Sequence, residues 1–361
     1  MKRYFLILAM LCLVTFCGCN NSTHRNDIPH NEIHYTSSDG KIIEPNWNDF
    51  GKGVSIVTNV YENGKGIITC NGDITAIGEY AFLYCRKLTS ITIPDSVTSI
   101  GAGAFEDCWN LTSITIPDSV TSIENMAFKN CTKLTSIAIP NSVASIGDWA
   151  FANCKGLTSI TIPGSVATIG WFAFSQCHNL TSVTIGNNVT SIGTGAFANC
   201  KGLTTFYGKF ASEDNRCLII DGTINSFAIG CGLSSYTITD GVAAIGGHAF
   251  EDCESLTSIT IPDSVTSIGT GAFEDCTSLI GITIPDRVTI IEDKAFYKCE
   301  SLTSIDCKAV TPPSLAVLYI LSDAFDYTNN ALIFVPEGSV EAYKTHKDWS
   351  KYADRIIGYN F

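Results

Sequence analysis

Residues 258–276 read SITIPDSVTSIGTGAFEDC, and nearly the same string occupies residues 90–108 and 113–131. The string belongs to a unit of 23 residues, LTSITIPDSVTSIGAGAFEDCWN, which first appears at residue 88. The unit starts at Leu88, Leu111, Leu134, Leu157, Leu180, Leu203, Leu233, Leu256, Leu279 and Leu302. A fixed period of this length is typical of a repeat solenoid, in which each unit forms one coil. Because one coil buries too little apolar surface to fold alone, we expect stacked coils with a cap at each end.

Each position of the unit has a physical interpretation when residue 88 is counted as position 1. Ile91 and Ile93 are two residues apart, which predicts a strand with its isoleucine side chains inward. Pro94 lacks an N–H and ends that strand. Ile100 belongs to a second wall, and Phe105 lies in a tight or helical turn with its ring in the core. The solenoid is therefore predicted to be β-rich with short helical turns.

Cysteine recurs at position 21 of the unit and predicts a column of structural thiols. Its members are Cys85, Cys108, Cys131, Cys154, Cys177, Cys200, Cys253, Cys276 and Cys299. Stacked coils bring these side chains close but point them in parallel, which disfavours disulfides. With no Cys-x-x-Cys or Cys/His spacing, we predict no metal site. Cys217 and Cys231 lie outside the column, and a disulfide between them remains open.

The first 18 residues have the pattern of a secretory signal peptide. Lys2 and Arg3 precede an apolar run that is too short to span a bilayer. The run ends in Phe16-Cys17-Gly18-Cys19, which resembles a bacterial lipobox and predicts lipidation of Cys19 as the mature N-terminus. The alternative is an ordinary signal peptide in which Cys19 is incidental. Residues 19–34 are polar and predict a flexible tether.

The motif L-x-x-I-x-I-P-x-x-V-x-x-I-G-x-x-A-F-x-x-C resembles the BspA-like, treponemal-type leucine-rich repeat of bacterial surface lipoproteins. The resemblance covers about residues 74–306 and implies a right-handed leucine-rich-repeat superhelix. Members are exported, often surface-anchored, and implicated in adhesion to host matrix proteins, to bacteria and to other cells. The flanking residues resemble caps of that family, at residues 35–73 and 307–361.

Two segments depart from the repeat. Residues 207–232 form an insertion whose centre, CLIIDGTINSFA, flanks Asp221-Gly222 with apolar runs and predicts a β-hairpin. Residues 339–357 approximate an amphipathic helix, which we expect to cover the last coil.

Aromatic residues replace small ones in the middle coils and are the candidate ligand-binding residues. Trp149 and Phe172 occupy position 16 of adjacent units, so we expect them about 5 Å apart, beside Trp171. Trp109 and His178 occupy position 22, on an edge that we expect to adjoin. Exposed aromatic residues indicate a contact site for sugar or protein. The alternative, rings that fold over the coil edge as packing, is equally open.

The remaining sequence favours a binding protein over an enzyme. We find no HExxH, G-x-S-x-G or P-loop motif, so no catalysis and no cofactor are predicted. A net charge of −13 disfavours nucleic acid and direct contact with anionic lipid. We therefore expect a monomeric, lipid-anchored adhesin at the outer membrane or cell surface that recognises a protein or glycan. The alternatives are an envelope scaffold that binds another protein of the same bacterium, and display on the periplasmic face.

The triplets Asp95-Ser96-Val97, Asp118-Ser119-Val120 and Asp263-Ser264-Val265 resemble an O-glycosylation sequon of Bacteroides-like bacteria. The same residues are also repeat consensus, so both interpretations stay open.

Overall fold

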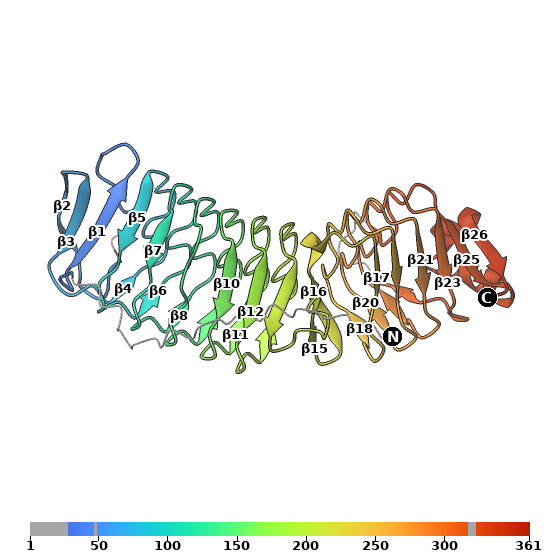
Figure 1. The fold of residues 1–361 in the computed structure, drawn as a ribbon. Coiled ribbons are helices and arrows are strands. Elements are labelled where there is room, and N and C mark those ends of the chain that lie inside the picture. Colours follow the sequence, from blue (N-terminus) through green and yellow to red (C-terminus); the bar gives the residue numbers. More distant parts are fainter. Residues whose placement is uncertain (1–27, 47–48, 317–322) are drawn as a thin grey trace, which may run out of the picture.

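The computed structural model describes residues 28–46, 49–316 and 323–361, and these form an elongated β-solenoid (Figure 1). This arrangement confirms the predicted repeat solenoid. The predicted signal peptide, Cys19 and the first part of the tether lie outside the described residues.

Every coil except the one that starts at Leu134 contributes a longer strand, within positions 1–6, to one face of the solenoid. These strands are β5 (Leu88–Thr92), β7 (Ser113–Thr115), β10 (Ser159–Ile162), β12 (Ser182–Ile185), β14 (Thr205–Gly208), β17 (Ser235–Thr237), β19 (Ser258–Thr260), β21 (Gly281–Ile284) and β23 (Ser304–Cys307). Within each sheet, neighbouring strands of this set pair in parallel and in register, so that Ile91 lies opposite Ile114. The isoleucines point into the core, and serine and threonine point outward, as predicted.

A two-residue strand at positions 12–13 forms the second wall. These strands are β4 (Ala76–Ile77), β6 (Ser99–Ile100), β8 (Ser122–Ile123), β9 (Ser145–Ile146), β11 (Thr168–Ile169), β13 (Ser191–Ile192), β18 (Ala244–Ile245), β20 (Ser267–Ile268), β22 (Ile290–Ile291) and β24 (Ser314–Leu315). Just before this wall, the hydroxyl of Ser264 donates to the carbonyl of Val242 in the preceding coil at 2.7 Å. Ser96 and Ser119 make equivalent bonds, so the hydroxyl groups of the Asp-Ser-Val triplets help to join the coils.

The third side of the coils consists of hydrogen-bonded turns at positions 15–20. The sequence was compatible with either a tight turn or a helical turn there. We call the bonds between these turns the turn ladder. The amides at positions 16, 18 and 20 donate to carbonyls at positions 15, 17 and 19 of the next coil. For example, the amide of Phe128 donates to Ala150 at 2.7 Å. The amide of Asn130 donates to Ala152 at 2.8 Å.

The phenylalanines at position 18 stack beneath the turn ladder. From Phe82 to Phe197 their ring centroids are 5.0–5.4 Å apart and the rings are nearly parallel. Phe206 then meets Phe197 edge-on at 5.7 Å and ends this column. A second column runs from Phe250 to Phe325. The phenylalanines therefore form two columns, separated by the insertion.

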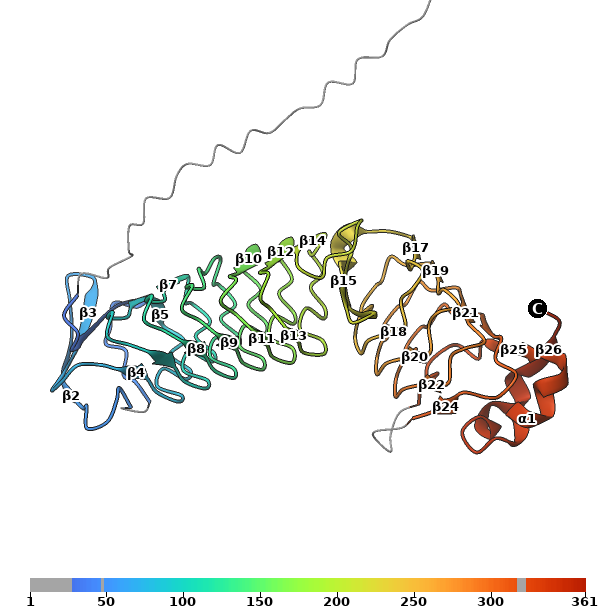
Figure 2. The same ribbon diagram turned by 90° about the horizontal axis from the view of Figure 1, so that it is seen from below.

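The insertion forms the predicted hairpin, from β15 (Cys217–Ile220) and β16 (Thr223–Phe227), followed by the 3-10 helix η1 (Ile229–Cys231). Strand β16 pairs with β18 and so begins the C-terminal stack of coils. Among the described residues, the turn amides of Gly195, Phe197 and Asn199 make no backbone bond to the hairpin. The solenoid bends at this break, with the short strands on the inner side (Figure 2).

The N-terminal cap is an antiparallel sheet of β2 (Ile56–Glu62), β3 (Lys65–Cys70) and β1 (Glu32–Ser37). Strand β1 also pairs with β5 and thus covers the first coil. The predicted tether ran to residue 34, but Glu32 to His34 already lie in β1, so the cap begins earlier.

The predicted amphipathic helix of the C-terminal cap is broken into shorter pieces. They are η2 (Glu337–Ser339), α1 (Val340–Thr345) and η3 (Ser350–Arg355), between β25 (Leu332–Pro336) and β26 (Ile356–Tyr359). The chain leaves the helix at His346 so that Trp349 can turn inward, where it is fully buried. The indole N–H donates to the carbonyl of Pro313 at 2.7 Å, and the ring packs on Phe325.

The cysteines at position 21 are buried and unpaired. The Cys154 thiol donates to the carbonyl of Phe128 in the preceding coil at 3.2 Å, and the same bond recurs through the column. Burial raises the pKa of Cys154 to about 12. The disulfide left open between Cys217 and Cys231 is absent, and Cys217 instead lies 3.3 Å from the hydroxyl of Tyr236.

We expect Phe151→Ala to lower the free energy of unfolding by about 3–5 kcal/mol, because the ring is fully buried between two stacked neighbours. Urea denaturation measures the change. The control is Thr161→Ala on the outward face, which should change stability by less than about 0.5 kcal/mol. Equal effects of the two substitutions would contradict the packing described.

Stability should fall as pH rises above about 8.5, the pKa of an unperturbed cysteine. The native pKa of Cys154 is about 12, so the unfolded chain loses its proton first and binds fewer protons in this window. The stabilising difference is complete below about 8.5 and is lost progressively toward 12. Denaturation midpoints across this range test the prediction. Cys154→Ala should show a shallower decline, and an equal decline would contradict the assignment.

Candidate functional site

Position 16, where the central candidates lie, requires an unusual backbone. Trp149 and Phe172 have φ of +58° and +53°, in the left-handed region that favours glycine. The consensus residue there is glycine, as at Gly195 with φ of +67°. Position 16 has this conformation throughout the described turns of both stacks, so a large side chain there costs strain.

Trp149 and Phe172 form the predicted stacked pair. Their ring centroids are 4.5 Å apart with an angle of 20° between the planes. Phe172 lies over Gly195, where an added Cβ would come within 2.4 Å of its ring. Across the insertion, Phe172 meets the His248 ring edge-on at 5.2 Å. Phe172 therefore packs over the coil edge, as the alternative interpretation expects. Trp149, in contrast, keeps 37% of its surface exposed.

Trp171 is the most accessible of the predicted residues, with 63% of its surface exposed. Its indole lies over Gly193, where an added Cβ would meet the ring at 2.5 Å. Its backbone amide donates to the Asp148 carboxylate at 2.7 Å. One edge of the indole therefore lies against Gly193 of the next coil, and most of the side chain faces solvent.

Trp109 belongs to a different local cluster on the N-terminal coils. Its indole N–H donates to the Asp107 carboxylate at 2.7 Å, and the Arg86 guanidinium lies 4.1 Å from its ring centroid. The ring is 42% exposed. A tryptophan with a cation on one face offers a mixed apolar and charged contact surface.

His178 is part of a short basic row rather than of the aromatic pair. Burial lowers the pKa of His178, and Lys155 and Lys201 lower it further. Its Nε2 atom is buried without a hydrogen-bond partner. Trp109 lies three coils away, or about 14 Å by strand spacing. The structure thus joins Trp149 with Phe172, and it leaves Trp109 and His178 at separate points of the solenoid.

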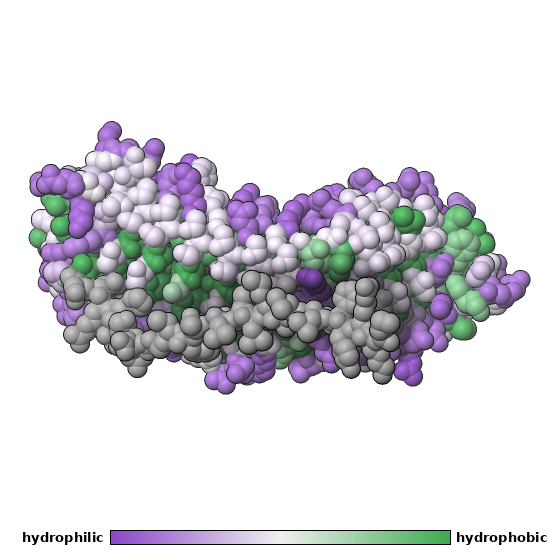
Figure 3. All heavy atoms as spheres, viewed as in Figure 1, coloured by the Kyte–Doolittle hydropathy of each residue, from purple (hydrophilic) through white to green (hydrophobic). Residues whose placement is uncertain are grey.

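The long-strand face opens next to β7, a feature that the repeat pattern did not predict. Within the described chain, residues 136–139 make no backbone hydrogen bond to β7 or β10. A cavity of about 430 Å³ lies there, and Ile114, Ile116 and Ile137 contribute to its lining. Hydrophobic side chains gather around β7 on this face (Figure 3). The opening is a second candidate contact surface.

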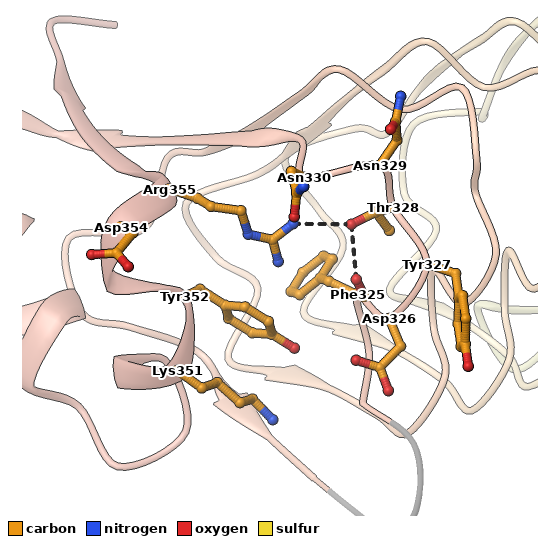
Figure 4. Close-up of a pocket in the computed structure, with 10 residues that line it drawn as sticks. All are labelled: Phe325, Asp326, Tyr327, Thr328, Asn329, Asn330, Lys351, Tyr352, Asp354 and Arg355. Atoms are coloured by element: carbon orange, nitrogen blue, oxygen red, sulfur yellow. Dashed lines mark hydrogen bonds between the residues drawn. The ribbon is translucent and has the colours of Figure 1, made fainter.

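A cavity of about 520 Å³ in the C-terminal cap was also missed by sequence reasoning (Figure 4). Arg355 reaches into it and donates to the Thr328 hydroxyl at 3.3 Å. The guanidinium also lies 4.8 Å from the Tyr352 ring centroid. Burial lowers the pKa of Arg355. The 23-residue spacing is lost in this segment of the sequence. The sequence therefore gave no indication that these residues lie close together.

No helix among the described residues has the length and apolar character needed to cross a bilayer.

Solved structures similar to this chain are bacterial leucine-rich repeat proteins. A leucine-rich repeat protein from Eubacterium ventriosum is 23% identical, with a TM-score of 0.62 over 85% of this chain and 80% of the other. A leucine-rich cell surface protein from Faecalibacterium prausnitzii is 25% identical, with a TM-score of 0.49 over 83% and 90%. A leucine-rich repeat protein from Bacteroides ovatus is 28% identical, with a TM-score of 0.36 over 84% and 90%.

No curated protein matches the chain. The family model of the BspA type leucine-rich repeat region matches in six copies, over residues 68–207 and 223–345. These ranges contain both stacks of coils described above. The chain therefore belongs to the BspA-type leucine-rich repeat family.

Proposed function

We propose that this protein is an exported binding protein of the cell surface that recognises a protein or glycan partner without catalysis. The observation that carries the proposal is the exposure of Trp171, at 63% of its surface, on a rigid turn of the N-terminal stack. Tryptophan is enriched among residues that dominate binding energy, because its large ring gains much from desolvation. An exposed indole on a solenoid edge therefore supports a contact role.

The surroundings of Trp171 extend the proposed contact surface along the turn side of the solenoid. Trp149 is partly exposed in the preceding coil, and its ring is fixed by Phe172. Because these rings are held by packing, they lose little conformational freedom on binding. Flat, fixed aromatic faces suit a sugar ring or an apolar protein patch.

The proposed location follows from the N-terminal sequence. We propose that residues 1–18 are a signal peptide and that Cys19 is the lipidated residue, so that a lipid anchor holds the solenoid outside the cytoplasm. Two acyl chains on one cysteine give stable anchoring. Membrane contact is then made by the lipid, and the acidic solenoid projects away from anionic headgroups.

Binding to a panel of extracellular-matrix proteins and glycans tests the proposal. We expect Trp171→Ala to weaken binding at least about tenfold, as removal of a central aromatic contact does. Tyr327→Ala is the matched control, because Tyr327 is a 67% exposed aromatic residue near the other end of the solenoid. Circular dichroism and thermal melts establish that both variants stay folded.

Equal binding by Trp171→Ala and wild type would contradict the assigned site and direct attention to the opening beside β7. Failure of the wild-type protein to bind any panel member would favour the envelope scaffold. Cross-linking in the native cell would then identify a bacterial partner.

A further inference from the structure

Three ligand-type side chains converge just after the hairpin, on the turn side of the C-terminal stack. His248 and Glu251 belong to one coil, and Glu274 belongs to the next. Each offers one ligand atom, and these three atoms all lie within 4.8 Å of one another. The Nδ1 atom of His248 is 3.1 Å from Glu251 Oε2. All three side chains are partly buried, so the group is accessible without being fully solvated.

The charges of this cluster differ from those at the equivalent place in the N-terminal stack. There, Glu106 at position 19 meets Lys129 at position 19 of the next coil, at 2.9 Å. In the cluster, Glu251 occupies position 19 of one coil, and Glu274 occupies position 19 of the next coil. Two carboxylates therefore lie in register. Like charges in register repel each other. Lys294 lies 3.8 Å from Glu274, on the side away from the Glu251 coil.

The backbone of the second coil approaches the cluster closely at a glycine. Gly271, at position 16, has φ of +58°, and an added Cβ would come within 2.9 Å of the His248 ring and 3.0 Å of Glu274. The Nδ1 atom of His248 is buried, yet it makes no hydrogen bond despite its closeness to Glu251. A buried imidazole nitrogen that makes no hydrogen bond and lies close to two carboxylates is an arrangement that a cation would complete.

We infer that His248, Glu251 and Glu274 bind a divalent transition-metal ion of the Zn²⁺ type. One imidazole nitrogen and two carboxylate oxygens form a donor set that suits Zn²⁺, whereas Ca²⁺ and Mg²⁺ prefer oxygen ligands alone. The ion relieves the repulsion between the two glutamates and links two successive coils. Three protein ligands leave at least one coordination position for water or for a donor atom of a partner.

Isothermal titration of the untagged, reduced full chain with Zn²⁺ tests the site. We expect one Zn²⁺ per chain and a rise in melting temperature, because a ligand that binds only the native state stabilises it. Glu251→Gln and Glu274→Gln preserve shape and should each weaken binding at least about tenfold. The matched control is Glu106→Gln, at the same position of a coil that lacks the histidine, and it should bind as wild type does.

Co²⁺ provides a second probe, because its visible spectrum reports the ligands directly. Nitrogen and oxygen ligation by the cluster gives weak visible bands and no thiolate charge-transfer band. A strong charge-transfer band would show that the ion binds cysteine, which would overturn the assignment. The inference also fails if wild type takes up no Zn²⁺, or if the two glutamine variants bind as tightly as wild type.

Discussion

The turn ladder is the interaction on which the rest of the structure depends. Between successive coils of a stack, amides at positions 16, 18 and 20 of the turn donate to the next coil, and this continues where the long strands separate around residues 136–139. Positions 16 and 20 of the turns lie in the left-handed region, which explains why asparagine and aspartate recur at position 20. Beneath it, the phenylalanine rings and thiols fill the space between coils. Where the ladder stops, at the hairpin, the core divides into two clusters and the solenoid bends.

The different roles of inward-pointing positions and rim positions explain where functional residues can arise. Positions that point inward are fixed by packing, so substitutions there lose stability. Positions 15, 16, 19 and 22 lie at the rim of the turns and vary from coil to coil. Trp171 occupies one such position in the N-terminal stack, and the His248 cluster occupies two others in the C-terminal stack. The same scaffold thus presents different chemistry along its length, and the two proposals are independent of each other.

The period of 23 residues predicted most of the fold, because stacking places equivalent residues one coil apart. It correctly predicted the solenoid and the contact between Trp149 and Phe172, and the Asp221-Gly222 turn signal correctly predicted the hairpin. The period did not reveal the turn conformation, since residues as large as Trp149 and Phe172 adopt positive φ at position 16 against their local propensity. Nor did it reveal the His248 cluster, although the period makes Glu251 and Glu274 neighbours. A search for ligands across adjacent coils, instead of along the chain, would have found them.

Amide hydrogen exchange of the unbound chain tests the central claim most directly. If the turn ladder holds the coils together, the amides at positions 16, 18 and 20 exchange most slowly within each stack. This holds even in the coil that starts at Leu134, whose long strand is unpaired. Protection should drop at Gly195, Phe197 and Asn199, where the ladder meets the hairpin. Slow exchange confined to the long strands, with fast exchange in the turns, would contradict the account.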